Sequence, residues 1–211
     1  MSAGARVASL GAGLGTAALA LAVHPESLPA HMAQHVVLTS VAAPLIVLGR
    51  PVTLLLRLAG PRRREIAAAL RSRAVRLLVR PALAWTLFIA VQWAFHLPPL
   101  FDLALERPAL HVLEHLLFLG TGILFWEVAI GDDPVPFRLT GPAQTLYLLL
   151  AIPANDLIMA RYMIVGETTA GAVMGAGMVP LALAVCVVTW SWLRREERRA
   201  RRWEAYVDAA R

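Results

Sequence analysis

Long apolar windows recur along this chain of 211 residues. Each is close to the roughly 20 residues that an α-helix needs to cross the hydrocarbon core of a bilayer. Only 16% of the residues are charged, whereas a typical soluble domain carries about a quarter. A chain with this pattern buries its apolar surface in lipid and between helices. We therefore predict an all-α fold, a polytopic membrane helix bundle.

The windows predict about six transmembrane helices within a single domain over residues 1–193, followed by a basic tail over residues 194–211. The predicted spans cover residues 5–23, 30–49, 81–97, 109–130, 142–163 and 171–193. The first window is rich in small residues and is preceded by only a weak basic region. Because further spans follow it, we interpret it as a retained helix rather than a signal peptide.

The positions of the arginines predict the orientation of the spans. All 20 basic residues are arginines, nine of them between residues 50 and 80 and seven in the tail. The three segments that should lie on the opposite side contain a single arginine, Arg107. Basic loops remain in the cytoplasm by the positive-inside rule. We therefore expect a multi-pass protein with both termini cytoplasmic.

The basic segment between the second and third spans has apolar residues at helical spacing from Ile66 to Val79. This pattern is typical of an amphipathic helix that lies on the cytoplasmic face of the membrane. The partner of the arginines is therefore expected to be the lipid bilayer, and no nucleic acid. The single cysteine, Cys186, lies within a span and cannot form an intramolecular disulfide.

All six histidines fall at the outer ends of the predicted spans. They are His24, His31, His35, His96, His111 and His115. The pair at 31 and 35 and the pair at 111 and 115 each have a spacing of four residues, which places both members on one side of a helix. Ionisable side chains at membrane depth usually face the interior of the bundle. Two such pairs and His96 therefore predict one cluster of imidazoles.

This cluster has the chemistry of a metal site. Imidazole binds copper, zinc and iron, and thioethers at the same depth favour Cu(I) over zinc, although methionine also commonly fills gaps between helices. The candidate ligands are His31, His35, His96, His111, His115, Met32, Met159, Met163 and Met174, with Glu114, Gln34 and Asp156 as supporting polar groups.

Three other interpretations remain open at this level. Histidines on the second and fourth spans have the placement of axial ligands in a b-type haem redox protein. A metal-free scaffold would use the histidines for hydrogen bonds between helices. A zinc hydrolase has the least support, because "HVLEH" lacks the residue order of an HExxH motif. No arrangement of serine or cysteine with histidine indicates a nucleophile, so we do not predict an enzyme.

Three sequence blocks resemble the CtaG family of cytochrome c oxidase assembly factors. They are "HMAQHVVLTSVAAPLIVLGRP", "WAFHLPPLFDLAL" and "LEHLLFLGTGILFW", and their order and spacing also fit. The resemblance extends over about residues 30–195. The chain departs from the family pattern at Phe101, where tyrosine is usual, at Glu167, where aspartate is more usual, and at Gly175, where tryptophan is common.

The resemblance implies a role in assembling a haem–copper oxidase in the bacterial cytoplasmic membrane, through delivery of copper to the oxidase. Its partners would be cytochrome c oxidase subunits and other copper chaperones. The positions that match the family blocks are His31, Met32, Gln34, His35, His96, Asp102, Glu114 and His115.

Overall fold

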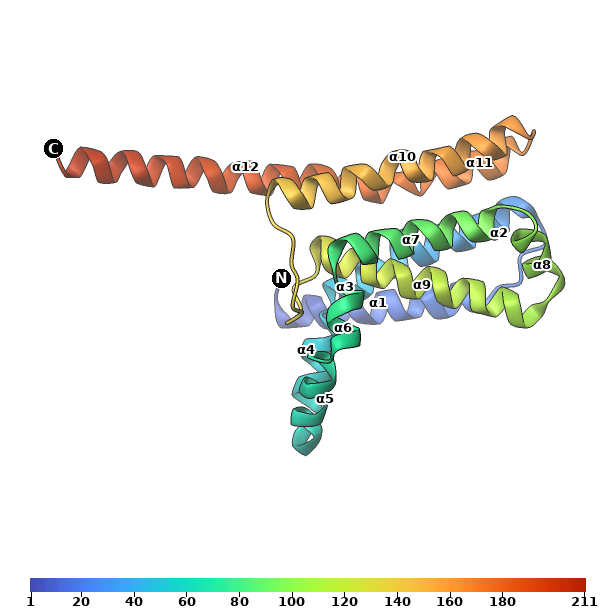
Figure 1. Ribbon diagram of the computed structural model, residues 1–211, viewed down its shortest axis with the longest axis horizontal. Helices are drawn as coiled ribbons and strands as arrows, with labels where there is room; N and C mark the ends of the chain where they lie inside the picture. The colour runs from blue at the N-terminus through green and yellow to red at the C-terminus, as the bar shows by residue number, and fades with distance from the viewer.

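The computed structural model describes residues 1–211, and every regular element in it is helical. The long helices run alongside one another as a single bundle (Figure 1). Five helices are long and apolar enough to cross a membrane, and a sixth is formed if the bent pair at Pro81–His96 and Leu100–Glu106 is counted as one span. The predicted polytopic helical bundle is therefore confirmed.

The elements are α1 (Ala3–Ala22), α2 (Leu28–Val36), the π-helical η1 (Val37–Ala42), α3 (Ala43–Leu48), α4 (Pro51–Leu58), the 3₁₀ turn η2 (Gly60–Arg62), α5 (Arg63–Leu70), α6 (Arg73–Leu78), α7 (Pro81–His96), α8 (Leu100–Glu106), α9 (Pro108–Ile130), α10 (Pro142–Ile164), α11 (Thr168–Ala176) and α12 (Met178–Ala209). The second predicted span corresponds to α2, η1 and α3 together. The sixth is divided between α11 and α12, and α12 continues as one helix through the basic tail (Figure 1).

The two ends of the bundle differ in chemistry. Both termini lie at one end (Figure 1), with residues 49–80 and the loop 131–141, and we call this the arginine end. The opposite end carries the α1–α2 loop, the end of α7, α8 and the start of α9, and we call it the histidine end. The arrangement is the one that the six-span prediction requires.

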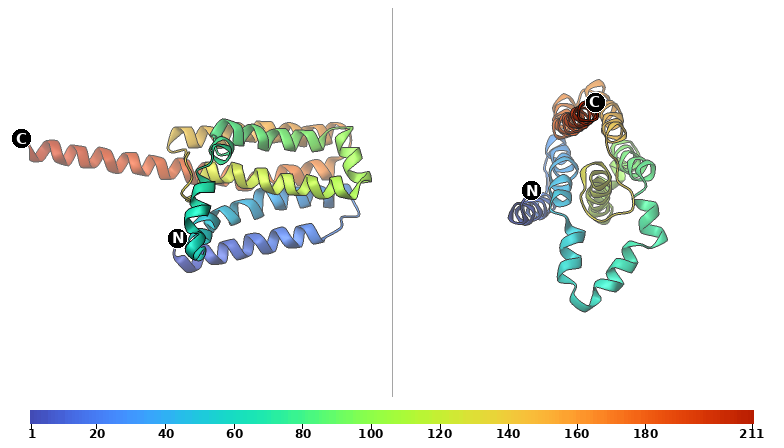
Figure 2. Two further views of the ribbon diagram at one scale, coloured as in Figure 1. Left: turned by 60° about the horizontal axis from the view of Figure 1, so that its bottom comes forward. Right: turned by 90° about the vertical axis from the view of Figure 1, so that its left-hand side faces the viewer.

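Helices α4, α5 and α6 form an arm that projects from the arginine end across the bundle axis (Figures 1 and 2). None of the three contains a buried residue. The amphipathic segment predicted from Ile66 to Val79 is divided between α5 and α6, because the Ser72 side chain accepts a hydrogen bond from the Val75 amide and caps the start of α6. The arm therefore runs parallel to the plane of a membrane that the bundle crosses.

The main apolar core lies between α3, α7, α9, α10 and α12. Phe125 stacks against Phe88 and Tyr147, with ring centroids 4.5 Å and 4.9 Å apart. The neighbouring Trp126 donates its indole N–H to the Thr39 carbonyl of η1 at 2.8 Å. A π-helical stretch leaves backbone carbonyls without their usual helical partner, and Trp126 supplies one. This contact joins α9 to the span that carries His31 and His35.

Helix α1 packs through small residues. A Cβ atom on Gly13 would lie 2.7 Å from the Ile46 amide nitrogen, so only glycine allows this close approach to α3. Near the histidine end, the Gln34 side-chain amide donates to the carbonyls of Ala20 and Val23. Gln34 therefore attaches the end of α1 to α2.

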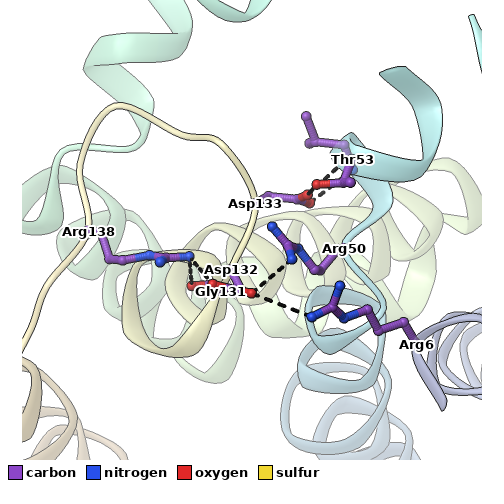
Figure 3. Close-up of polar contacts among 8 residues, drawn as sticks. Arg6, Arg50, Thr53, Gly131, Asp132, Asp133 and Arg138 are labelled. Carbon is purple, nitrogen blue, oxygen red and sulfur yellow. Dashed lines mark hydrogen bonds and ion pairs between the residues drawn. The ribbon is translucent and has the colours of Figure 1, made fainter. Parts of the chain in front are cut away.

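An ion-pair network joins three segments at the arginine end (Figure 3). Asp132 lies 2.7 Å from Arg138, 3.0 Å from Arg50 and 3.9 Å from Arg6. The hydrogen bond from Arg138, together with the charges of Arg50 and Arg6, holds the pKa of Asp132 below its usual range. The network connects the α9–α10 loop to α1 and to the start of the arm.

The neighbouring Asp133 caps the arm. Its buried carboxylate accepts hydrogen bonds from the amides of Val52 and Thr53 at 2.9 Å and 2.7 Å, and from the Thr53 hydroxyl at 2.6 Å (Figure 3). Arg50, the N-cap residue of α4, makes no side-chain capping bond. The Asp133 carboxylate of the α9–α10 loop therefore caps the N-terminus of α4 in place of an N-cap side chain.

We expect Asp133→Ala to lower the free energy of unfolding by about 2 kcal/mol, because it leaves two helix N-terminal amides and a hydroxyl without partners. Thermal unfolding in detergent, followed by circular dichroism, measures this. The half-exposed Asp132 provides the control, and Asp132→Ala should cost less than about 1 kcal/mol. Equal losses in the two variants would contradict the capping role.

Candidate metal centre

Three helices bring five histidines together at the histidine end. His31 and His35 project from α2, His111 and His115 from α9, and His96 from the last residue of α7. The imidazole rings of the α2 and α9 histidines face one another, with centroids between 5.0 Å and 5.6 Å apart. The histidines that the sequence predicts to cluster do lie together.

Four of these side chains form a compact group. One donor atom each from His31, His111, Glu114 and His115 lies within 4.8 Å of the others. His111 Nε2 is 3.3 Å from His31 Nδ1, and Glu114 Oε2 is 3.8 Å from His31 Nε2. A tetrahedral ion with bonds of about 2 Å holds its donor atoms about 3.3 Å apart. The group is therefore close to, and slightly wider than, a coordination shell.

His35 and His96 form a second, deeper contact. His35 Nδ1 is 3.4 Å from His96 Nε2, and both side chains are buried. The ring of Phe118 packs against both, with centroids 4.4 Å from His35 and 5.5 Å from His96. Phe118 thereby separates these two imidazoles from the part of the bundle toward the arginine end.

The hydrogen positions in this deeper pair follow from its partners. His96 Nδ1 lies 2.6 Å from the Gln92 carbonyl, which only accepts, so Nδ1 carries the hydrogen. In a neutral imidazole the lone pair is then on Nε2, and His35 Nδ1 donates to it. The lone pair of His35 is left on Nε2, which faces Glu114 Oε1 at 3.5 Å. With Glu114 ionised, these two atoms are both acceptors, and only a proton or a metal cation between them satisfies both.

Glu114 lies at the centre of this arrangement. Its side chain is 0% exposed, and neither oxygen has a hydrogen-bond partner. The Nε2 atoms of His31, His35 and His115 are also buried without partners. A buried, unpaired carboxylate costs several kcal/mol unless it takes up a proton or binds a cation. The donor set therefore fits a metal ion.

Access to the group is from the histidine end. His111 is partly exposed, whereas His31, Glu114 and His115 are buried. On α8, Phe101 packs edge-on against His31, with ring centroids 6.2 Å apart. His111 is therefore the side chain that an approaching ion meets first.

The candidate methionines occupy a neighbouring position. Met32 and Met174 belong to a buried apolar cluster with Ile158, Tyr162 and Ala170, and Met159 packs against it. Met163 is 44% exposed. Of the four, Met174 lines a cavity that His35 also lines. Met32, Met159 and Met174 therefore fill space between α2, α10 and α11, as methionine commonly does.

The two other supporting groups lie apart from the four-residue group. Gln34 is engaged by the carbonyls of α1. Asp156 is half-buried on α10 and forms no hydrogen bond or ion pair with another side chain. Glu114, predicted to support a ligand, is instead as close to the imidazoles as they are to one another.

Gln92 is a polar residue of this region that the sequence analysis missed. It lies one turn before His96 on α7, and its side-chain amide is 3.5 Å from Asn155 on α10. Both line a cavity of about 20 Å³ beside His35, enough for about one water molecule. The spacing of four residues between Gln92 and His96 is the signal that points to it.

Comparison with known proteins places this chain in a family. The family model for the cytochrome c oxidase caa3 assembly factor (Caa3_CtaG) matches residues 3–195. The chain belongs to this family of assembly factors. The match begins within α1, so the family resemblance extends over the first helix as well as over the blocks noted in the sequence.

Relatives of this CtaG-family chain occur in mycobacteria. Uncharacterised proteins of Mycobacterium bovis and Mycobacterium tuberculosis are each 29% identical to it over 210 residues, covering 85% of this chain and 32% of theirs. One from Mycobacterium leprae is 32% identical over 132 residues, covering 58% of this chain and 20% of its own. The chain thus spans about a third or less of the length of these relatives. No solved structure matches it.

Proposed function

We propose that this CtaG-family chain is a copper-binding assembly factor without catalytic activity. In this proposal it carries one copper ion, as cargo, among His31, His111, Glu114 and His115 and passes it to a haem–copper oxidase. The observation that carries the proposal is the convergence of three imidazoles and one carboxylate, whose donor atoms lie within 4.8 Å of one another.

The unpaired atoms of the site support a cation as the ligand. The lone pair of His35 Nε2 faces a carboxylate oxygen at 3.5 Å, and Glu114 has no donor for either oxygen. Buried polar atoms in folded proteins are nearly always paired. A cation bound to Glu114, or a proton shared by Glu114 and His35, satisfies these atoms, whereas a neutral ligand without a hydrogen to donate does not.

Copper is preferred to zinc because of the surroundings of the group. Three imidazoles and a carboxylate suit either ion. Met174, however, lines the cavity beside His35, and thioethers favour Cu(I). His111 is partly exposed, so the group is partly open. A Cu(I) ion held there can therefore exchange its ligands for those of the oxidase.

The orientation of the chain follows the same proposal. The arginine end faces the cytoplasm of a bacterial inner membrane, because it contains nearly all of the basic residues. The histidine end then faces outward, where other copper chaperones and the oxidase subunits would meet it. Delivery would therefore take place on the outer side.

A haem group fits this site less well than one ion. The imidazoles of α2 and α9 already contact one another, with His31 and His111 stacked at a centroid distance of 5.0 Å. The cavity beside His35 is about 20 Å³, and a porphyrin between the helices would have to separate them. The packing therefore favours a small ion over the b-type haem alternative.

Metal analysis and Cu(I) titration of the purified protein test the proposal. We expect about one Cu(I) per chain, no Soret band in the absorption spectrum, and loss of copper in the His31→Ala/His35→Ala double variant. His24→Ala, which removes an exposed histidine of the α1–α2 loop, is the matched control and should bind as wild type does. Equal copper content in the double variant and wild type would overturn the ligand assignment, and a Soret band would favour haem.

A further inference from the structure

Two adjoining hollows lie at the arginine end, between α12 and the rest of the bundle. The first, of about 520 Å³, is lined by apolar side chains that include Leu48 of α3, Trp126 of α9 and Val187 of α12. The second, of about 630 Å³, is lined by polar groups that include Trp192 and Arg195. Both share Arg195, so together they form one groove with an apolar floor and a basic mouth.

The groove exists because α12 packs against α10 and only loosely against α3. Leu181 and Val188 are the only buried residues of α12. Leu183 and Val187 are 60% and 63% exposed and face the hollow or the lipid. Within a bilayer no water fills such a surface, and hydrocarbon must cover it.

Charge is concentrated at the mouth. Arg195 lines both hollows and a third beside Trp190, and it has no carboxylate within 4 Å. The other arginines of the mouth are paired, Arg138 with Asp132 at 2.7 Å (Figure 3) and Arg199 with Glu196 at 2.8 Å. These two carboxylates are the acidic groups that line the mouth. One guanidinium therefore remains free to meet an anion.

The length of the apolar floor matches one leaflet. Along α12 it extends from Pro180 to Ser191, which is about 16 Å at a rise of about 1.5 Å per residue. Half of a hydrocarbon core of about 30 Å is roughly 15 Å. A transmembrane helix of a partner protein would need a surface about twice as long.

We propose that this groove binds one anionic phospholipid of the leaflet at the arginine end. An acyl chain lies along Leu48, Trp126 and Val187, and the phosphate meets Arg195. Trp192, whose indole N–H donates no hydrogen bond within the chain and whose ring packs against Gly141, is placed to bind the glycerol and phosphate oxygens. Basic pockets between helices commonly bind anionic headgroups in this manner.

Native mass spectrometry of the whole protein in mild detergent tests this site. We expect wild type to retain one phosphatidylglycerol in preference to phosphatidylcholine. Arg195→Gln should weaken retention of phosphatidylglycerol about fivefold, as expected for one arginine near a lipid phosphate. Its control is Arg202→Gln, which removes an unpaired arginine two turns further along α12 that does not line the groove. Val187→Trp, which fills the floor, should reduce retention of both lipids, and Val179→Trp on the same helix should not.

Each of three outcomes would overturn the proposal. The first is equal lipid retention in the Arg195→Gln and Arg202→Gln variants. The second is competition by glycerol phosphate as strong as by the intact lipid, which would make the mouth a site for free phosphate. The third is an effect of Val187→Trp on oxidase maturation with lipid retention unchanged, which would assign the groove to a protein partner. Copper content is read in the same samples, so failure here is distinguishable from failure of the copper site.

Discussion

Replacing His31 and His115 together with alanine is expected to weaken Cu(I) binding on the order of 10⁴-fold. A four-ligand site binds its metal with roughly 12 kcal/mol, or about 3 kcal/mol per ligand, so the loss of two ligands removes about 6 kcal/mol. The deeper pair should matter far less. His35→Ala/His96→Ala is expected to change the affinity no more than about 100-fold, as partners of ligands do.

Competition with a Cu(I) chelator of known affinity measures both values in detergent. His24→Ala controls for the loss of a histidine outside the cluster, and size-exclusion profiles show that each variant is folded. Similar losses in the two double variants would contradict the division into a four-residue group and a deeper pair. A larger loss of Cu(I) affinity in the His35→Ala/His96→Ala variant would indicate that the ion binds between these two rings instead.

The depth of the histidines could be predicted from the sequence, because span boundaries and arginine positions determine which residues share an end of the bundle. The division of the cluster into a four-residue group and a deeper pair could not, because it depends on how each helix is rotated about its axis. That rotation is set by contacts such as Trp126 with the Thr39 carbonyl and the close packing of Gly13 against Ile46. No periodicity within one helix predicts such contacts between helices.

Glu114 and the methionines show this difference clearly. Glu114 precedes His115 in the chain, and the sequence suggests a supporting role, yet the rotation of α9 places its carboxylate between His31 and His35. Met32, Met159 and Met174 share the depth of the histidines, but their helices turn them toward the cluster with Ile158 and Tyr162. The sequence thus predicts the depth of a side chain in the membrane, whereas the packing of the helices determines which side chains it contacts.

The arginines show a similar limit. Their clustering predicts the end at which they lie, and the structure agrees. The pairing of Arg6, Arg50 and Arg138 depends on Asp132 in the loop 131–141, whereas Arg195 has no carboxylate within 4 Å. The loop has no pattern that predicts its path, so the free guanidinium at the groove could be found only in three dimensions.

Glu114→Gln is expected to change stability and copper binding in opposite directions. In the metal-free protein it removes a buried charge that has no partner, and the new amide can donate to the lone pair of His35 Nε2, 3.5 Å away. We expect the thermal midpoint of the metal-free protein to rise by roughly 3 °C or more. Because the neutral amide is a poor ligand, Cu(I) affinity should fall on the order of 100-fold.

Paired measurements of thermal unfolding with and without Cu(I) test both effects in one experiment. Glu127→Gln is the matched control, because Glu127 is a second buried acid of α9, at the arginine end, with one oxygen unpaired. Neutralisation of Glu127 should stabilise the metal-free protein in the same way, but the copper affinity of this variant should not change. A Glu114→Gln protein that is less stable without metal and binds copper normally would show that the carboxylate supports the fold. A higher thermal midpoint without metal, together with weaker Cu(I) binding, would instead show that the Glu114 carboxylate lowers the stability of the metal-free protein and serves to bind a cation.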